Sequence, residues 1–335
     1  MDTAKLSENE YSMENKTMFS KMNDRRIPLL KDIRIFVAAV SIMIFALVGS
    51  VIAESKQKAF PTGEEAVNAF IKALREENKQ ELLVILGADA NDLISSGDEV
   101  ADRQKHEMFV KAYDEQHKLD VDGNNLVIVV GKNDWPFPIP LVKQSEQWVF
   151  DTDAGKGEIL NRRIGQNELD AIQVMLAIVD AQLEYAMKSR DSNGLPEYAQ
   201  KFRSDAGKKD GLYWETKEGE EPSPLGPLFS QAKQEGYFKN ESAEGPQPYH
   251  GYFYRILTAQ GANAPDGAFD YIIEGKMIGG FAAIAYPAEY GNSGVMSFIV
   301  NHDGVVYQKN LGEDTEQEAQ AVKLFDPDKT WTKAQ

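Results

Sequence analysis

Residues 167–190 decide the fold, and they read NELDAIQVMLAIVDAQLEYAMKSR. Asn167 can cap a helix here, with Asp170 at the third helical position. Apolar side chains then recur at helical spacing along one face: Leu169, Ile172, Met175, Leu176, Val179, Leu183 and Ala186. We predict a long helix whose apolar stripe packs on a sheet, and an exposed helix that forms a dimer is the alternative.

The chain after this helix is first polar and then rich in strand patterns. Residues 190–247 are rich in Lys, Asp, Glu, Gly and Pro, and two apolar anchors interrupt them, GLYW (211–214) and SPLGPLF (223–229). Such anchors indicate an ordered excursion and a place for a partner-specific surface. From residue 248 the pattern is typical of strands, with a hairpin turn predicted at Asp303-Gly304 between β-branched runs.

A separate group of helices and strands precedes the long helix. It begins at FPTGEEAVNAFIKALREEN (60–78), where Thr62 and Glu65 make a capping box. Shorter helices are predicted at 80–85 and within 103–118, and strands follow. In WPFPIPLV (135–142) the prolines remove hydrogen-bond donors from one side of the strand, which predicts a sheet edge. A polyproline segment offered to an aromatic groove is the alternative.

These patterns together predict an α+β fold. A small helix-plus-sheet domain occupies residues 56–158, and a second domain, residues 164–326, packs one long helix on an antiparallel sheet. Residues 1–53 form a cytoplasmic leader followed by a signal or anchor helix.

The N-terminal region has the charge pattern of an export signal. No residue from Ile35 to Ala53 is charged, and basic residues such as Arg25, Arg26 and Arg34 precede this run. Basic residues on the leading side keep the N-terminus in the cytoplasm. The run is either a cleaved signal peptide or an uncleaved membrane anchor. In both cases we predict that the rest of the chain is periplasmic or otherwise extracytoplasmic.

Composition argues against several classes of partner and cofactor. The formal net charge of −17 disfavours nucleic acid, because an acidic surface repels phosphate backbones. The chain has no cysteine, which removes thiolate chemistry and iron–sulfur clusters. It also has no GxxxxGK[ST] motif and no GxGxxG after a strand, so we predict no nucleotide and no cofactor.

The candidate site residues cluster around PYHGYFYRIL, residues 248–257. One interpretation is an aromatic strand that only packs. The other is a cleft rimmed by side chains that dominate recognition surfaces, for which the candidates are Tyr249, His250, Arg255, Tyr290 and His302. A metal site that joins His250 and His302 with Asp303 has no close sequence spacing to support it, so we predict no metal and assign no catalytic residue.

Several long motifs carry a family resemblance, among them WPFPIPLVK, DGLYW, SPLGPLF, PYHGYFYRILTAQG and MIGGFAAIAYPAEYGNSG. From about Pro61 to Asp326 the chain resembles the exported bacterial proteins catalogued as domain of unknown function 2950. The resemblance implies export and a two-part architecture, and it implies no activity.

The functional hypothesis is therefore an exported cell-envelope protein. We predict a non-enzymatic interaction or assembly module with an envelope protein as its partner, and membrane contact through residues 35–53 if these stay attached. The alternative is an enzyme or binding protein that acts on envelope polymer or peptide through the cleft lined by tyrosine, histidine and arginine.

Overall fold

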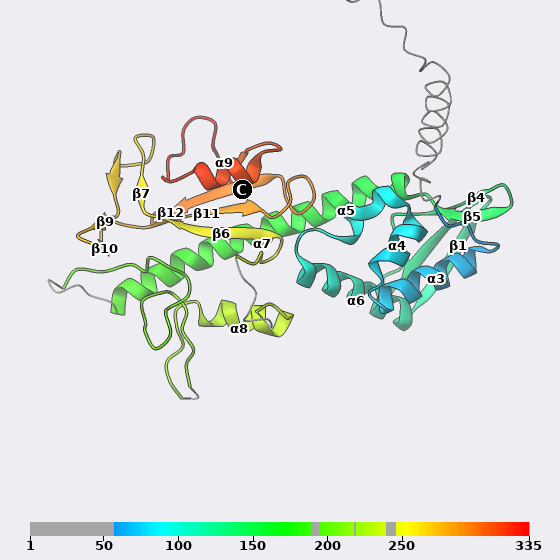
Figure 1. Cartoon of the computed structure of the whole chain (residues 1–335), viewed down its shortest axis with the longest axis horizontal. Coiled ribbons are helices and arrows are strands. Elements are labelled where there is room, and N and C mark those ends of the chain that lie inside the picture. Colours follow the sequence, from blue (N-terminus) through cyan, green and yellow to red (C-terminus); the bar gives the residue numbers. More distant parts are fainter. Residues whose placement is uncertain (1–56, 189–193, 218, 239–245, 335) are drawn as a thin grey trace, which may run out of the picture. The chain divides into compact units, whose positions relative to one another are not determined.

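A computed structural model describes residues 57–188, 194–217, 219–238 and 246–334. Within these ranges the protein has seven α-helices and antiparallel sheets, which confirms the predicted α+β class (Figure 1). These residues belong to one compact unit, Ser55–Gln335. No helix in the described part of the chain has both the length and the apolar character to cross a membrane. The signal or anchor run predicted at 35–53 lies outside the described residues.

Three of the first helices form close to where the sequence predicts them: α3 (Gly63–Arg75), α4 (Lys79–Leu86) and α6 (Glu99–Glu115). The short 3-10 helix η1 (Ala88–Ala90) and α5 (Asn91–Ile94) are additional. Thr62 caps α3, since its Oγ1 accepts a hydrogen bond from the Glu65 backbone N–H at 3.1 Å. Gly87 ends α4 with φ near +100°, a conformation that favours glycine.

The first sheet has the order β1-β2-β4-β5, with β3 also paired to β2. Its strands are β1 (His117–Asp122), β2 (Asn125–Val130), β3 (Trp135–Pro136), β4 (Leu141–Gln144) and β5 (Gln147–Phe150). The predicted one-sided pairing holds for β3, which pairs with β2 alone among the described strands. The predicted sheet edge is wrong for Leu141 and Val142, because these residues of β4 pair with both β2 and β5.

Helix α7 (Thr152–Lys188) is longer than the sequence predicts, and the proposed cap at Asn167 is wrong. The helix begins fifteen residues before Asn167. Gly155 permits this start because any Cβ there would lie 2.5 Å from the Pro138 carbonyl oxygen, so only glycine lets the first turn pack against residues 138–139. The helix also continues unbroken through residues 158–164, where we placed the boundary between two domains.

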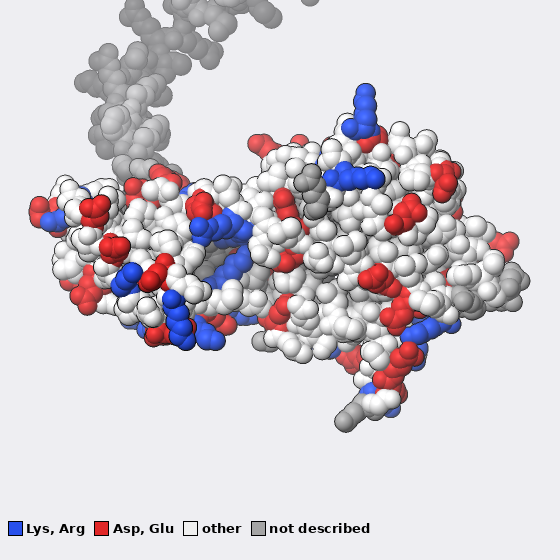
Figure 2. All heavy atoms as spheres, turned by 180° about the vertical axis from the view of Figure 1, so that it is seen from behind, with Lys and Arg blue, Asp and Glu red and all other residues white. Residues whose placement is uncertain are grey.

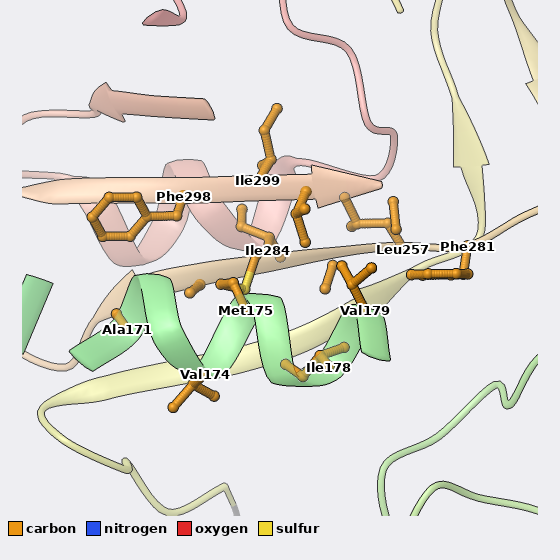
Figure 3. Close-up of a cluster of buried hydrophobic side chains, with 14 of the residues drawn as sticks. Ala171, Val174, Met175, Ile178, Val179, Leu257, Phe281, Ile284, Phe298 and Ile299 are labelled. Carbon is orange, nitrogen blue, oxygen red and sulfur yellow. The ribbon is translucent and has the colours of Figure 1, made fainter. Parts of the chain in front are cut away.

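The buried face of α7 overlaps the predicted stripe only in part. Leu169 and Leu183 are 58% and 41% exposed. Three residues of the predicted stripe are buried, Met175, Val179 and Ala186, and the other buried apolar residues in this half are Ala171, Val174, Ile178 and Ala181. The helix has two apolar neighbours. Figure 3 shows Met175 directed at Ile284 of the sheet, whereas Val174 and Ile178 line an apolar pocket shared with helix α8 (Gly226–Glu235).

The second sheet has the order β14-β13-β12-β11-β6 and is antiparallel throughout. Its strands are β6 (Tyr252–Leu257), β11 (Ala282–Pro287), β12 (Met296–Asn301), β13 (Tyr307–Asn310) and β14 (Thr332–Lys333). Two-stranded sheets flank it: β7 (Ala259–Gln260) with β8 (Phe269–Asp270), and β9 (Ile272–Ile273) with β10 (Lys276–Met277). Helix α7 contacts β11 and β12, and α9 (Thr315–Ala321) contacts β11 from the opposite face (Figure 1).

The β12–β13 connection confirms the predicted hairpin turn. The Asn301 side-chain oxygen accepts from the Asp303 backbone N–H, and the Gly304 N–H donates to the Asn301 carbonyl. The predicted anchors of the polar excursion are also present, because Leu212, Tyr213 and Leu225 are buried.

Two hydrophobic clusters form the interior. We call the first core the cluster built from α3–α6, the first sheet and the start of α7, and the second core the cluster built from the rest of α7, α8, α9 and the second sheet. The large side chains of the first core include Phe70, Ile71, Leu82, Ile85, Ile128, Leu141 and Phe150. Those of the second core include Tyr252, Tyr271, Phe281, Phe298 and Phe325.

Buried hydrogen bonds connect the parts of the chain that form the two cores. Asp98 caps α6, and its Oδ2 also accepts from the Tyr237 hydroxyl and from the Gly251 N–H, each at 2.9 Å. Asn167 of α7 donates from Nδ2 to the Ser293 carbonyl at 2.9 Å. Asn167 therefore has a junction role in the middle of the helix.

Candidate ligand-binding site

The candidate site is a cavity of about 310 Å³ beside the first core. Its walls come from α6, α7 and the proline-rich residues 135–139, and its base comes from α3, α4 and α5. The apolar lining consists of Phe70, Leu74, Leu82, Leu86, Leu93, Ile94, Phe109, Trp135, Phe137, Pro138, Ile139 and Ile159. Figure 2 shows a hollow in this part of the molecule, with Lys and Arg side chains gathered beside it.

An aromatic–cation pair forms part of the lining nearest to solvent. The Arg162 guanidinium lies over the Trp135 ring, 5.6 Å from its centroid. Trp135 is 37% exposed, and its ring meets Phe109 edge-on at 6.2 Å. Arg162 also donates from Nε to an exposed Glu158 carboxylate oxygen at 2.7 Å.

Lys105 supplies an unpaired cation at the polar end of the cavity. Its Nζ is buried and has no hydrogen-bond partner among the described residues. The neighbouring Asp102 carboxylate is occupied, because its two oxygens accept from the Ser96 N–H at 2.8 Å and the Ser96 hydroxyl at 2.7 Å. Burial lowers the pKa of Lys105, and the nearby Arg163 charge lowers it further.

Arg163 is the second buried cation at this end, and it is 7% exposed. Its Nη2 donates to the Leu93 carbonyl at 2.7 Å, and its Nη1 donates to the Asn292 side chain and to the Asp92 carbonyl. Its Nε lacks a partner within the described ranges. Burial lowers the pKa of this guanidinium too, but an arginine stays protonated in proteins.

His106 also lines the cavity, and burial lowers its pKa. We therefore expect a neutral imidazole at pH 7. The arrangement as a whole is an apolar cavity whose polar end holds Lys105, Arg163 and the Asp102 carboxylate.

The predicted site residues Tyr249 and His250 lie together in the turn before β6. The His250 ring is between two carboxylates, with Nδ1 3.8 Å from an Asp170 oxygen and Nε2 3.6 Å from a Glu235 oxygen. Tyr249 is buried against this ring, with centroids 4.1 Å apart. Burial and the Glu235 charge raise the pKa of the Tyr249 hydroxyl.

Arg255 has a structural partner. Its Nη2 donates to the Ala319 and Val322 carbonyls, each at 2.7 Å, so it caps the C-terminal end of α9. Tyr290 lies in the turn at 289–294 and is half-buried, with its backbone bridged to Gly294.

His302 lies at the opposite end of the second sheet from His250. It follows Asn301, which is opposite Ala282 of β11, whereas the β6 end beside His250 is opposite Pro287. The five predicted residues therefore do not line one cleft. No group of three or more metal-ligating side chains occurs in the described part of the chain.

Sequence reasoning missed the two cations that matter most to this site. On α6, Asp102, Lys105, His106 and Phe109 occupy positions i, i+3, i+4 and i+7, which places them on one helix face. A lysine and a histidine beside a phenylalanine at helical spacing could have signalled a polar end within an apolar site. Nothing comparable marks Arg163, since its helix was predicted to begin after it.

The fold and this cavity together define an α+β protein with a candidate ligand-binding site. The family model described as "Protein of unknown function (DUF2950)" matches residues 57–334, so the chain belongs to this family. Neither the curated proteins nor the solved structures gave a match.

Proposed function

We propose that this chain is an exported cell-envelope protein that binds a small, mainly apolar ligand in the cavity beside the first core. The observation that carries the proposal is the cavity itself, at about 310 Å³. A mostly apolar pocket with a few polar groups at one end is the usual form of a small-molecule site. The proposal favours a non-enzymatic role, because the cavity's charged groups are suited to holding a ligand in place.

The proposed site replaces the cleft that the sequence suggested. Arg255 already caps α9, and His302 lies at the far end of the sheet, so neither supports a site around His250. An envelope protein partner remains part of the proposal, and cross-linking in the source cells followed by mass spectrometry tests it.

A neutral apolar dye tests the binding role directly. We expect N-phenylnaphthylamine to bind the protein saturably, with a rise in its fluorescence. Ile159→Trp should abolish this rise, because Ile159 lines the cavity and indole fills it. Leu169→Trp is the matched control on the same helix, since Leu169 is 58% exposed. Absence of saturable binding to the wild type, or full binding to Ile159→Trp, would refute the proposal.

Export rests on the uncharged run at 35–53 and the basic residues before it. A tag after Gln335, followed by cell fractionation and intact-mass measurement, tests this part. A periplasmic protein that lacks about the first 53 residues indicates cleavage. A full-length protein in the membrane fraction indicates an anchor. A full-length protein in the cytosol would contradict export.

A further inference from the structure

The two buried cations at the polar end of the cavity each keep a nitrogen atom without a hydrogen-bond partner among the described residues. No carboxylate among the described residues forms an ion pair with Lys105 or Arg163 within 4.0 Å. The nearest acidic groups have other donors: Asp102 binds Ser96, and Asp98 binds Tyr237 and the backbone of Gly251. The Asp102 carboxylate lies close enough to attract both cations but forms no hydrogen bond with either, so Lys105 Nζ and Arg163 Nε have no acceptor among the described residues.

Burial of an unpaired ammonium is expensive. An ionised group without a hydrogen-bonded partner loses hydration that a protein interior does not replace. A protein that keeps Lys105 Nζ and Arg163 Nε in this state gains from any anion that reaches them. Hydrogen bonds between charged groups are also about twice as strong as neutral ones.

The rest of the cavity restricts what that anion can be. Its lining away from the cations is apolar, from Phe70 and Leu74 of α3 to Phe137 and Ile139 beside the sheet. A free inorganic anion would leave this surface empty. An engineered apolar cavity of about 150 Å³ holds benzene, so a cavity of about 310 Å³ can take a larger group such as a medium-length alkyl chain.

We propose that the ligand is an anionic amphiphile, whose carboxylate or phosphate head group binds at Lys105 and Arg163 and whose alkyl chain fills the apolar part of the cavity. This inference rests on the binding function proposed above. It adds that the head group carries a negative charge, and it assigns Lys105 and Arg163 as the residues that select this charge.

The test compares four probes that share an eight-carbon chain. Octanoate, octyl phosphate, octanol and octylamine are titrated into the protein purified from its source cells, by calorimetry at pH 7. We expect the two anions to bind at least tenfold tighter than octanol, and octylamine to bind weakest. The relative affinity of octanoate and octyl phosphate distinguishes a carboxylate head group from a phosphate head group.

A variant assigns the selectivity to one side chain. Lys105→Met keeps the length of the side chain and removes the charge, so octanoate should bind at least tenfold more weakly while octanol binding stays the same or improves. Lys111→Met is the matched control, because Lys111 is an exposed lysine on the same helix. Lys105→Arg should restore the preference for octanoate over octanol in part.

The outcomes separate this inference from the proposed function. Equal affinity for octanol and octanoate would overturn the anionic head group and leave the cavity as a binding site. The same affinity for octanoate in Lys105→Met as in the wild type would overturn the assignment of Lys105. No binding of any of the four probes, together with no dye binding, would overturn the proposed function as well.

Discussion

Asp98→Ala should destabilise the protein more than any surface substitution, because this one buried carboxylate accepts three hydrogen bonds. Asp98 is 1% exposed. Its Oδ1 accepts from the Ala101 N–H at 3.1 Å and caps α6, and its Oδ2 accepts from the Tyr237 hydroxyl and the Gly251 N–H. The substitution therefore removes a helix cap and leaves two buried donors without an acceptor.

The magnitude follows from these three bonds. Loss of an N-cap costs about 1 kcal/mol, and each hydrogen bond to a charged acceptor contributes roughly 1.5–3 kcal/mol. Their sum is about 4–7 kcal/mol. The energies of hydrogen bonds that share one carboxylate are not additive, so we expect a loss of about 4 kcal/mol in the free energy of unfolding.

Urea denaturation, followed by circular dichroism and tryptophan fluorescence, measures this loss as a lower midpoint with an unchanged slope. Asp114→Ala is the matched control on α6. Asp114 makes an exposed ion pair with Arg75, so this substitution should lower the free energy of unfolding by at most about 1 kcal/mol. A double-mutant cycle with Tyr237→Phe isolates the hydroxyl bond. A coupling energy below about 0.5 kcal/mol would refute the reasoning, because residues that share a buried bond must couple.

Three further predictions use other parts of the protein. Gly155→Ala should lower the free energy of unfolding by roughly 1–3 kcal/mol, because the new Cβ would lie 2.5 Å from the Pro138 carbonyl oxygen. Gly157→Ala in the same helix has open space and should raise it by about 0.5–1 kcal/mol. Urea midpoints that move in the same direction for the two variants would contradict this. Arg255→Met should cost roughly 1.5–3 kcal/mol through lost bonds to the last carbonyls of α9, and hydrogen exchange should rise in α9 first. Burial lowers the pKa of Lys105, so between the folded pKa and 10.5 the unfolded state binds more protons than the folded state. The stability of the wild type should therefore rise relative to that of Lys105→Met as the pH increases through this window. Parallel curves of stability against pH for the two proteins would argue against a buried cation.

Local signals in the sequence were sufficient where neighbouring residues determine the structure. Thr62 and Glu65 identify the start of α3, and Asp303-Gly304 identifies a hairpin turn, because caps and tight turns depend on a few adjacent residues. The α+β class follows from such elements. The sequence therefore predicted elements such as α3, α4 and the β12–β13 hairpin near their true positions, but it did not predict α8, α9 or β1.

The predictions are wrong where contacts between distant parts of the chain determine the structure. The start of α7 has glycines and charged residues, so its helix propensity is low, and contact between Gly155 and the proline-rich segment stabilises it instead. Leu169 is apolar but exposed, since the face of α7 that is buried depends on where the sheet and α8 lie. The candidate site was missed for the same reason. Lys105 and Arg163 are distant in the sequence, and only the fold shows that they share one end of a cavity.

The continuity of α7 has a consequence for how the length of this chain can change in evolution. Arg163 lines the cavity beside the first core and Met175 packs in the second core, and one unbroken helix of 37 residues contains both. An inserted residue between them would turn everything beyond it by about 100° and advance it by about 1.5 Å. Even seven inserted residues, which nearly restore the direction, would move the second core by about 10 Å. Insertions and deletions among members of the family should therefore be absent from α7 and frequent in exposed loops such as 205–209, where chain length is independent of helical phase.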